Sequence, residues 1–465
     1  MTDPLSPYAT AADIAEAVAI GAVSARAVAE AALGRAGADP YAAFTDLTAE
    51  RALAEAVATD AARAAGRPLG SLAGVPYAVK NLFDVEGLTT RAGSKILRER
   101  PPAAQDATLV ARMRAAGATL LGALNMGEFA YDFTGENAHD GACRNPHDPS
   151  RMAGGSSSGS GAAVAGGLAT VALGSDTNGS IRVPSSFCGV FGLKPTYGRL
   201  SRAGSFPFVD SLDHLGPFAR SATDLALAYD ALQGHDPADH ACAARPAEPC
   251  LPTLGDGVAG LRVGQPADWF EAVAGEQALA AVARAAEALG GAGRIAIEGI
   301  PQGRAAAYLI TNAESSAFHL PMLRARAADY DPDTRDRFLA GALAPAAWLT
   351  QAQRVRRWFL GRLMETFRAV DLVIAPATPF PAPRIGEKTV SMAGREVLLR
   401  PNIGVLSQPF SCVGLPVVTV PVFAPGALPI GVQIVAPPWR EDLCLRAARA
   451  LERAGVAVAH APRAP

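Results

Sequence analysis

Apolar residues along the first 200 positions of this 465-residue chain follow two different periods. Between residues 11 and 32 and again between 48 and 65, they recur at roughly helical spacing. Short apolar runs bounded by glycine turns lie between and after these segments and predict buried strands. Helices that alternate with buried strands are typical of an α/β domain built on a central sheet. The predicted strands are GVPYAV (74–79), ATLLGAL (118–124), a strand in TVALGSD that ends at Gly174, and CGVFGLKP (188–195).

The rest of the chain continues this alternation without an internal repeat. Asp106 is expected to cap a helix that ends at Ala116, and the small apolar run 161–169 predicts a buried helix. Residues 236–255, rich in Ala, Pro and His, predict a surface connection, and residues 274–364 are mostly helical in pattern. The late strands are as apolar as the early ones, so we expect them to complete one sheet. They span 371–377, 415–422 and 429–436, and a final helix starts near Glu441.

Composition narrows the class of protein. The chain is 49% hydrophobic and 18% charged, with a net charge of −2, which suits a globular core and gives no electrostatic footprint for nucleic acid or an anionic membrane. Six cysteines without a C-x-x-C pair predict a reduced, cytoplasmic protein. The N-terminal residues do not resemble a signal peptide, and the longest uncharged small-apolar run, 161–174, is too short to span a bilayer.

Several kinds of site fit the sequence poorly. The seven histidines form no H-x-H or zinc-helix spacing, so we expect no metal. The stretch RMAGGSSSGSGAAVAGG (151–167) matches neither a phosphate loop nor a dinucleotide fingerprint, so no cofactor is expected either. Ser157 stands in a G-x-S-x-G match, with Asp210 and His214 as its required partners. The preceding residues NPHDPSRMA predict a loop, however, whereas a hydrolase nucleophile elbow directly follows a strand.

A second cluster of serine and glycine is more informative. In GSDTNGSIRVPSSFCGVFGLKPTYG (174–198) a strand ends and a tight turn, Thr177–Gly179, leads to Ser180. Such a turn lets consecutive backbone N–H groups point at one spot, as an oxyanion hole requires. Lys80 ends a very apolar strand, and desolvation there would favour a neutral amine that acts as a base near pH 7. Each feature alone also fits a simple glycine turn or an edge lysine.

Together, GVPYAVKNLFD, AGGSSSGSGAAVA and GSDTNGSIRVPSSFCGVFGLKPT, in this order, resemble the amidase signature family of serine hydrolases. The likeness continues through DLVIAPATP, GLPVVTVPV and LPIGVQIVAPPW, and so covers essentially the whole chain. It implies one large α/β/α domain over residues 1–465 with a central mixed, mostly parallel sheet. Within it, a helical segment would occupy about 1–70 and the signature core about 71–200.

The resemblance also implies a Ser–Ser–Lys triad without metal or cofactor. Lys80 matches the family lysine, Ser180 matches the nucleophile, and Ser156 matches the bridging serine, which follows Gly155 through a cis peptide. Most of the family has glycine where this chain has Asn178. The oxyanion hole would be formed by the backbone N–H groups of Thr177, Asn178, Gly179 and Ser180.

The TNGSIRVP variant, with NMGEFAY and CRNPHDPS, is similar to the carboxybiuret hydrolase branch of the family. That branch cleaves small urea-derived amides with release of ammonia. The resemblance therefore implies an oligomer, and a small helical partner similar to the small subunit of the tRNA-dependent amidotransferase. Arg182, which would otherwise form an ion pair with Asp176, is a candidate cation for a substrate carboxylate, as are Arg199 and Arg202. The residues predicted to bind substrate are Tyr131, Gly154, Gly155 and Arg182.

Three alternative functions stay open at this point. Close relatives of the carboxybiuret branch act on ureides such as oxalurate, so the substrate is less specified than the reaction. A glutaminase role, as the A-type subunit of an amidotransferase, needs the same triad. A non-enzymatic module with a glycine-rich anion site needs neither Ser156 nor Ser180.

Overall fold

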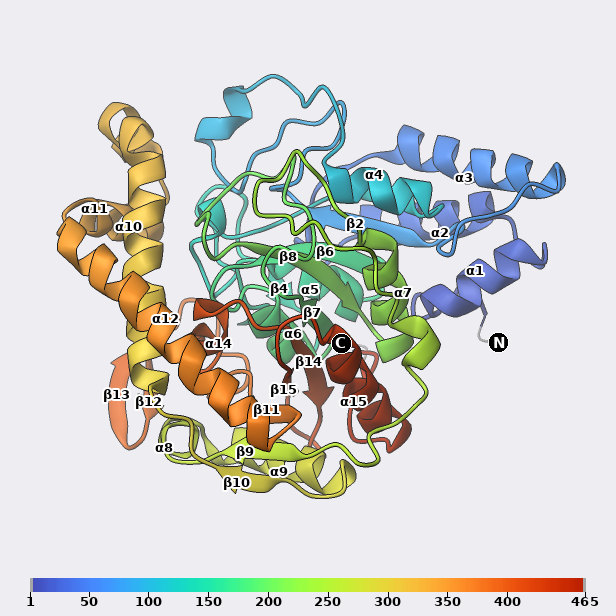
Figure 1. Cartoon of the computed structure of the whole chain (residues 1–465). Coiled ribbons are helices and arrows are strands. Elements are labelled where there is room, and N and C mark those ends of the chain that lie inside the picture. Colours follow the sequence, from blue (N-terminus) through green and yellow to red (C-terminus); the bar gives the residue numbers. More distant parts are fainter. Residues whose placement is uncertain (1–2, 463–465) are drawn as a thin grey trace.

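A mixed sheet of eleven strands runs through the computed structural model, which describes residues 3–462 (Figure 1). The strand order is β1-β3-β2-β6-β8-β7-β14-β15-β11-β9-β10. The strands are β1 Phe44–Leu47, β2 Pro76–Lys80, β3 Thr119–Leu124, β6 Val171–Asp176, β7 Phe191–Lys194, β8 His214–Ala219, β9 Val263–Pro266, β10 Gly293–Ile295, β11 Leu372–Pro376, β14 Val417–Val422 and β15 Ile430–Val435. Two small hairpins stand apart, β4 Arg144–Asn145 with β5 Asp148–Met152 and β12 Thr389–Met392 with β13 Arg395–Leu398.

Fifteen α-helices within residues 3–462 surround the sheet. They are α1 Ala11–Ala19, α2 Ala25–Gly37, α3 Ala49–Ala64, α4 Thr108–Ala115, α5 Ser158–Ala165, α6 Arg182–Cys188, α7 Ala222–Leu232, α8 Trp269–Val273, α9 Glu276–Ala288, α10 Ile300–Arg326, α11 Pro332–Ala342, α12 Ala346–Ala369, α13 Arg400–Ile403, α14 Gln408–Cys412 and α15 Glu441–Arg453. In that same part of the chain no helix is long and apolar enough to cross a membrane.

The late strands join the same sheet as the early ones, as the sequence predicted. The sheet is mixed, but the expectation that it would be mostly parallel is wrong. Among the described strands, four pairings are parallel and six are antiparallel. The reason lies in the connections, because helices cross over between β2, β3 and β6, whereas only the short loop 423–429 separates β14 from β15. A connection this short forces antiparallel pairing.

Strand alternation in β2 decides which face of the sheet Lys80 occupies. Tyr77 and Val79 pack into the apolar cluster that includes α4 and α7. Ala78 belongs to a separate cluster with the alanines of α5 on the opposite face. Because side chains alternate with a period of two along a strand, Lys80 lies on the same face as Ala78, toward α5.

Two local predictions in the first quarter of the chain are wrong. The pattern at 11–32 forms two helices, because Gly21 adopts a φ of 76° after α1 and Ser24 caps α2 by accepting the Ala27 N–H. Asp106 does not cap α4, which begins at Thr108 without a side-chain cap. Asp106 instead forms a bidentate ion pair with Arg51 of α3, at 2.7 and 2.8 Å.

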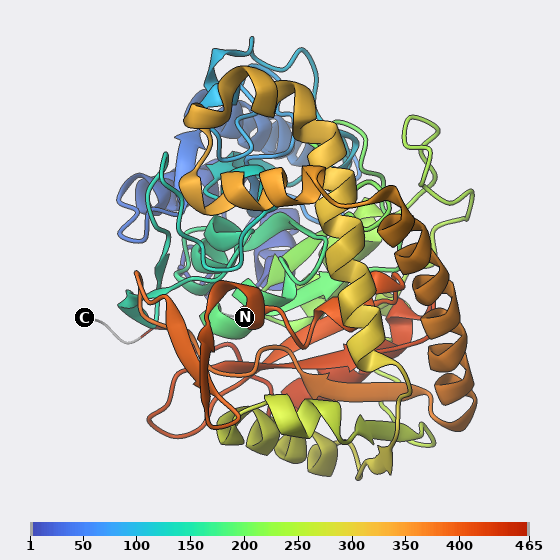
Figure 2. The same ribbon diagram turned by 90° about the vertical axis from the view of Figure 1, so that its left-hand side faces the viewer.

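The predicted helical stretch 274–364 contains most of a helical arm made of α10, α11 and α12. In Figure 1 these helices lie together at one side of the sheet, and Figure 2 shows the arm facing the viewer. The short strand β10 interrupts the stretch before α10 begins. Strand β8 and helix α7 follow Lys194 and were missed by the sequence pattern.

Candidate active site

The carboxyl ends of two neighbouring parallel strands bring the signature residues together. Strand β2 ends at Lys80 and strand β6 ends at Asp176, and the two strands are hydrogen-bonded in parallel. Parallel strands end at the same edge of a sheet, where α/β proteins commonly place their sites. Lys80 and the turn 177–180 therefore face one region of the molecule.

Lys80 is fully buried and lies between two hydroxyls. Its Nζ atom is 2.7 Å from Ser156 Oγ and 2.8 Å from Ser175 Oγ. Burial lowers the pKa of Lys80 to about 7, although the carboxylates of Asp213, Asp176 and Asp132 oppose the shift. A lysine with this pKa is neutral in a large fraction of molecules near pH 7, and a neutral amine accepts a proton.

Ser156 follows the cis peptide Gly155–Ser156, the bond that the sequence predicted. The Ser156 carbonyl accepts the Gly127 N–H at 3.1 Å, so the backbone on both sides of this peptide is tied to the segment 127–135. The N–H groups of Gly154 and Gly155 donate to the carbonyls of Thr134 and Phe133. Neither glycine lines the pocket beside Ser180. The backbones of Gly154 and Gly155 thus hold the segment around Ser156 in place, and their role as substrate contacts stays a prediction.

The other serines of the glycine-rich stretch anchor it to neighbouring backbone. Ser157 Oγ donates to the Ser175 carbonyl at 3.1 Å and accepts the Ser175 N–H at 3.2 Å. Ser158 and Ser160 donate to the carbonyls of Asn125 and Leu173. These three hydroxyls are therefore engaged as structural hydrogen bonders, which leaves Ser156 as the hydroxyl of this stretch that contacts Lys80.

The turn between β6 and α6 presents four consecutive backbone N–H groups, those of residues 177–180. None of the four donates to an acceptor within residues 3–462. The turn is held from outside: Thr177 donates its hydroxyl to Asp213 at 2.6 Å, and the Asn178 carbonyl accepts from Ser407 Oγ at 2.7 Å. Gly179 has a φ of 142°, a conformation that favours glycine. A fixed turn with free N–H donors has the form of an oxyanion hole.

Ser180 lies at the end of this turn, is 3% exposed and lines a narrow cavity of about 20 Å³. No hydrogen bond joins Ser180 to Ser156 in the described part of the chain. Catalytic hydrogen bonds are often long before substrate binds and tighten in the complex. The structure thus establishes the Lys80–Ser156 contact and the position of Ser180 on the cavity wall.

Arg182 differs from its predicted role as a substrate contact. It is fully buried, and its guanidinium forms a bidentate pair with Asp176 at 2.9 Å. Burial alone would raise the pKa of Asp176, but Arg182 outweighs it and holds that pKa well below its usual range. The remaining N–H groups of Arg182 donate to the Ser407 carbonyl, Gln433 Oε1 and Ser411 Oγ. Because its donors are used in this way, Arg182 supports the turn 177–180 and has none left for a substrate.

Tyr131, which is predicted to bind substrate, lines the cavity together with Arg337, a cation that sequence reasoning missed. The Tyr131 hydroxyl donates to Asn312 Oδ1 of α10. The guanidinium of Arg337, from α11, stacks 3.7 Å from the centre of the Tyr131 ring and donates to the Tyr131 carbonyl at 2.8 Å. Among the described residues no carboxylate pairs with Arg337. It is therefore a cation of the cavity wall that is available to an anion.

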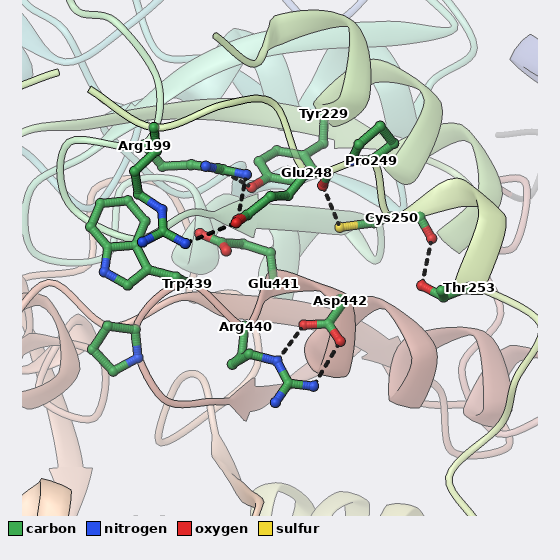
Figure 3. Close-up of a pocket in the computed structure, with 12 residues that line it drawn as sticks. Arg199, Tyr229, Glu248, Pro249, Cys250, Thr253, Trp439, Arg440, Glu441 and Asp442 are labelled. Atoms are coloured by element: carbon green, nitrogen blue, oxygen red, sulfur yellow. Dashed lines mark hydrogen bonds and ion pairs between the residues drawn. The ribbon is translucent and has the colours of Figure 1, made fainter. Parts of the chain in front are cut away.

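The other two predicted cations, Arg199 and Arg202, do not line this cavity. Figure 3 shows Arg199 in a separate pocket of about 570 Å³ with Tyr229 and Glu248. Its guanidinium donates to Tyr229 Oη at 3.1 Å and to Glu248 at 3.0 Å. Arg202 is paired with Asp239 at 2.9 Å. Both arginines are therefore structural.

Three residues of the site were missed by sequence reasoning: Ser175, Asp213 and Arg337. Ser175 stands in the GSD run at the end of a predicted strand, but no motif marks it as a partner of Lys80. Asp213 lies in the loop directly before β8, and Arg337 lies in α11, so both come from parts of the chain outside the motifs. Within residues 3–462 no three His, Cys, Asp or Glu side chains are grouped so that they could hold a metal ion.

The fold and the site together define a class of enzyme. The chain matches the Amidase family over residues 27–445 and belongs to that family. It is therefore a hydrolase that acts on C–N bonds of amides.

Among individual proteins, the chain is similar to AtzE, a 1-carboxybiuret hydrolase subunit of Pseudomonas sp. (strain ADP). The two are 54% identical over 450 residues, which cover 96% of this chain and 98% of that protein. The A-type subunit of glutamyl-tRNA(Gln) amidotransferase from Anaeromyxobacter sp. (strain K) is 39% identical over 468 residues, with 94% of each chain covered. A solved structure described as a vestigial protein complex that reveals the evolutionary origins of an s-triazine catabolic enzyme is 53% identical. It has a TM-score of 0.96 and covers 97% of this chain and 100% of that one.

The buried pair of Arg182 and Asp176 generates a prediction about stability. Arg182→Gln leaves the Asp176 carboxylate buried without a cation, so the free energy of unfolding should fall by about 3–5 kcal/mol. Asp176→Asn in the Arg182→Gln background removes the stranded charge and should recover part of that loss. Thermal and urea denaturation of the single and double variants measure both effects. If the double variant were no more stable than Arg182→Gln alone, the assignment of a buried charge pair would be contradicted.

Proposed function

We propose that this chain is the catalytic subunit of an amidohydrolase that cleaves a small carboxylated, urea-derived amide of the carboxybiuret type and releases ammonia. The observation that carries the proposal is the contact of a buried lysine with Ser156, next to a turn whose backbone N–H groups lead to Ser180. The 54% identity to a 1-carboxybiuret hydrolase subunit supports the substrate class.

The first half of the reaction forms an acyl-enzyme. Neutral Lys80 takes the proton of Ser156 Oγ, and Ser156 takes the proton of Ser180 as Ser180 Oγ attacks the amide carbonyl carbon. The carbonyl oxygen becomes an oxyanion, which the N–H groups of residues 177–180 stabilise. When the C–N bond breaks, the proton on Lys80 returns through Ser156 to the leaving nitrogen, and ammonia departs.

The second half regenerates the enzyme by the same groups. Ser156 takes a proton from a water molecule and passes its own proton to Lys80, while the water oxygen attacks the acyl carbon on Ser180. The second oxyanion forms in the same N–H turn and then collapses. The C–O bond to Ser180 breaks, Ser180 recovers its proton through Ser156, and the acid product leaves.

Arg337 is the residue that we assign to the substrate carboxylate. It lines the cavity with Ser180, and no carboxylate pairs with it among the described residues. Stacking on Tyr131 and the bond to the Tyr131 carbonyl hold the guanidinium in one orientation. A fixed guanidinium with free donors matches the geometry of a carboxylate.

The chain is proposed to work with a small helical partner similar to the small subunit of the amidotransferase. The relative with 54% identity is itself described as one subunit of its enzyme, and the solved structure with a TM-score of 0.96 is described as a protein complex. A partner of this kind would make the active enzyme a hetero-oligomer.

Ammonia release from carboxybiuret tests the reaction. Ser180→Ala should lower kcat by more than about 10³-fold, because it removes the nucleophile. Ser185→Ala, a buried serine of α6 whose hydroxyl has no partner in the described chain, is the matched control and should retain turnover. The assay is run with the chain alone and with the small partner, and with glutamine as a competing substrate. Near-normal turnover by Ser180→Ala, or a preference for glutamine, would contradict the proposal.

The pH profile tests the lysine. Because the reaction needs neutral Lys80, whose pKa is lowered by burial to about 7, kcat/KM should rise with pH and reach half its maximum near pH 7. Burial also lowers the pKa of Lys194 to about 7. Lys194 is therefore the control: in Lys194→Met the rise of kcat/KM between acidic and neutral pH, the acidic limb of the profile, should stay at the same pH. A flat profile, or a limb that disappears in Lys194→Met, would show that Lys80 is not the titrating base.

Substitution of Arg337 tests carboxylate binding. Arg337→Met should raise KM for the carboxylated substrate by about 10- to 100-fold, with a smaller effect on kcat, since a charge-assisted hydrogen bond contributes about 1.5–3 kcal/mol. Arg335→Met on the same helix is the control, because the side chain of Arg335 pairs with its neighbour Asp336 and not with a cavity residue. Steady-state kinetics on carboxylated and uncharged amides distinguish loss of carboxylate binding from a general loss of substrate binding. An equal rise in KM for both substrates would overturn the assignment.

A further inference from the structure

Asn178 stands in the turn 177–180, directly before Gly179, and its side chain lies at the candidate active site. The residue is 6% exposed and lines the same narrow cavity as Ser180 and Arg337. The Asn178 amide therefore places polar atoms on the turn that leads to Ser180.

The hydrogen bonds of Asn178 are incomplete. Its Nδ2 group donates to Thr311 Oγ1 of α10 at 2.7 Å, and its backbone carbonyl accepts from Ser407. The side-chain oxygen Oδ1 is buried and has no partner among the described residues. Buried polar atoms in native proteins nearly always have a hydrogen-bond partner, so an unpaired acceptor on a residue that lines the cavity indicates a donor that arrives with the ligand.

Helix α10 fixes the orientation of this acceptor. Thr311 is 2% exposed, and the next residue, Asn312, accepts the hydroxyl hydrogen bond of Tyr131. Asn178 and Tyr131 are thus both tied to consecutive buried positions of one helix. With Nδ2 held by Thr311, Oδ1 cannot turn away to find another partner without breaking that bond.

We infer that Asn178 determines specificity by accepting, through Oδ1, a hydrogen bond from an N–H group bonded to the scissile carbonyl of the substrate. In a ureide both neighbours of that carbonyl are nitrogen, whereas in an ordinary carboxamide one of them is carbon. A methylene group cannot donate to Oδ1 and would leave the acceptor unpaired. A site built to hydrogen-bond a substrate group rejects the analogue that lacks it. The inference rests on the proposed function and specifies its substrate class.

Two substrates that differ at one group test this inference. Ureidoacetate and succinamate carry the same carboxylate and terminal amide, and an N–H in the first replaces a CH₂ in the second. The measured quantity is the ratio of kcat/KM for ureidoacetate over succinamate, from ammonia release. Their intrinsic difference in reactivity, and any general damage to the turn, cancel when this ratio is compared between variants. In Asn178→Gly the ratio should fall by at least about tenfold from the wild-type value.

Thr311 provides a second pair of variants outside the turn. Thr311→Val removes the hydroxyl that orients Asn178 and should lower the same ratio by about threefold or more, whereas Thr311→Ser keeps the hydroxyl and should preserve it. An unchanged ratio in both Asn178→Gly and Thr311→Val, with both substrates turned over, would overturn the inference and leave the proposed function standing. Failure of the wild-type enzyme to release ammonia from any carboxylated ureide would overturn the proposed function, and this inference with it.

Discussion

The burial of one amine organises this site. Among the described residues Lys80 forms no ion pair; it contacts the hydroxyls of Ser156 and Ser175, and the loss of solvent lowers its pKa to about 7. A charged ammonium in such surroundings is unfavourable, so the fold itself maintains a base. The rest of the site depends on this constraint, because a hydroxyl relay is useful only if a neutral amine stands at its end.

Buried charges elsewhere hold the geometry around that amine. Arg182 and Asp176 neutralise one another beside the turn 177–180, and Asp213 fixes Thr177 at the start of the turn. The backbone N–H groups of the turn have no acceptor in the described chain because side chains, not the turn's own amides, fasten it in place. Preorganised donors of this kind stabilise an oxyanion without rearranging during the reaction.

Much of the architecture follows from local pattern, and the exceptions have local causes. The apolar runs predicted β2, β3, β6, β11, β14 and β15 because continuous apolar segments fit strands buried on both faces. The prediction of a single helix over 11–32 was wrong because Gly21 and Ser24 end one helix and begin another. The prediction of a mostly parallel sheet was wrong because strand pairing depends on the length of the connecting loops as well as on strand composition. Strand β8 was missed because HLGPFA lacks a strong apolar period.

For the site, the sequence by itself determined the residues that carry the proposed chemistry: Lys80, Ser156 and Ser180 stand in motifs whose order and spacing identify the family. Only the tertiary structure decided which polar side chains reach the cavity beside Ser180. Arg182, two residues after Ser180 in the chain, forms a buried ion pair with Asp176. Arg337, far away in sequence, lies against the Tyr131 ring. The physical reason is that motifs fix backbone conformation locally, whereas a free charge or an unpaired acceptor is defined by all its neighbours, which only packing brings together.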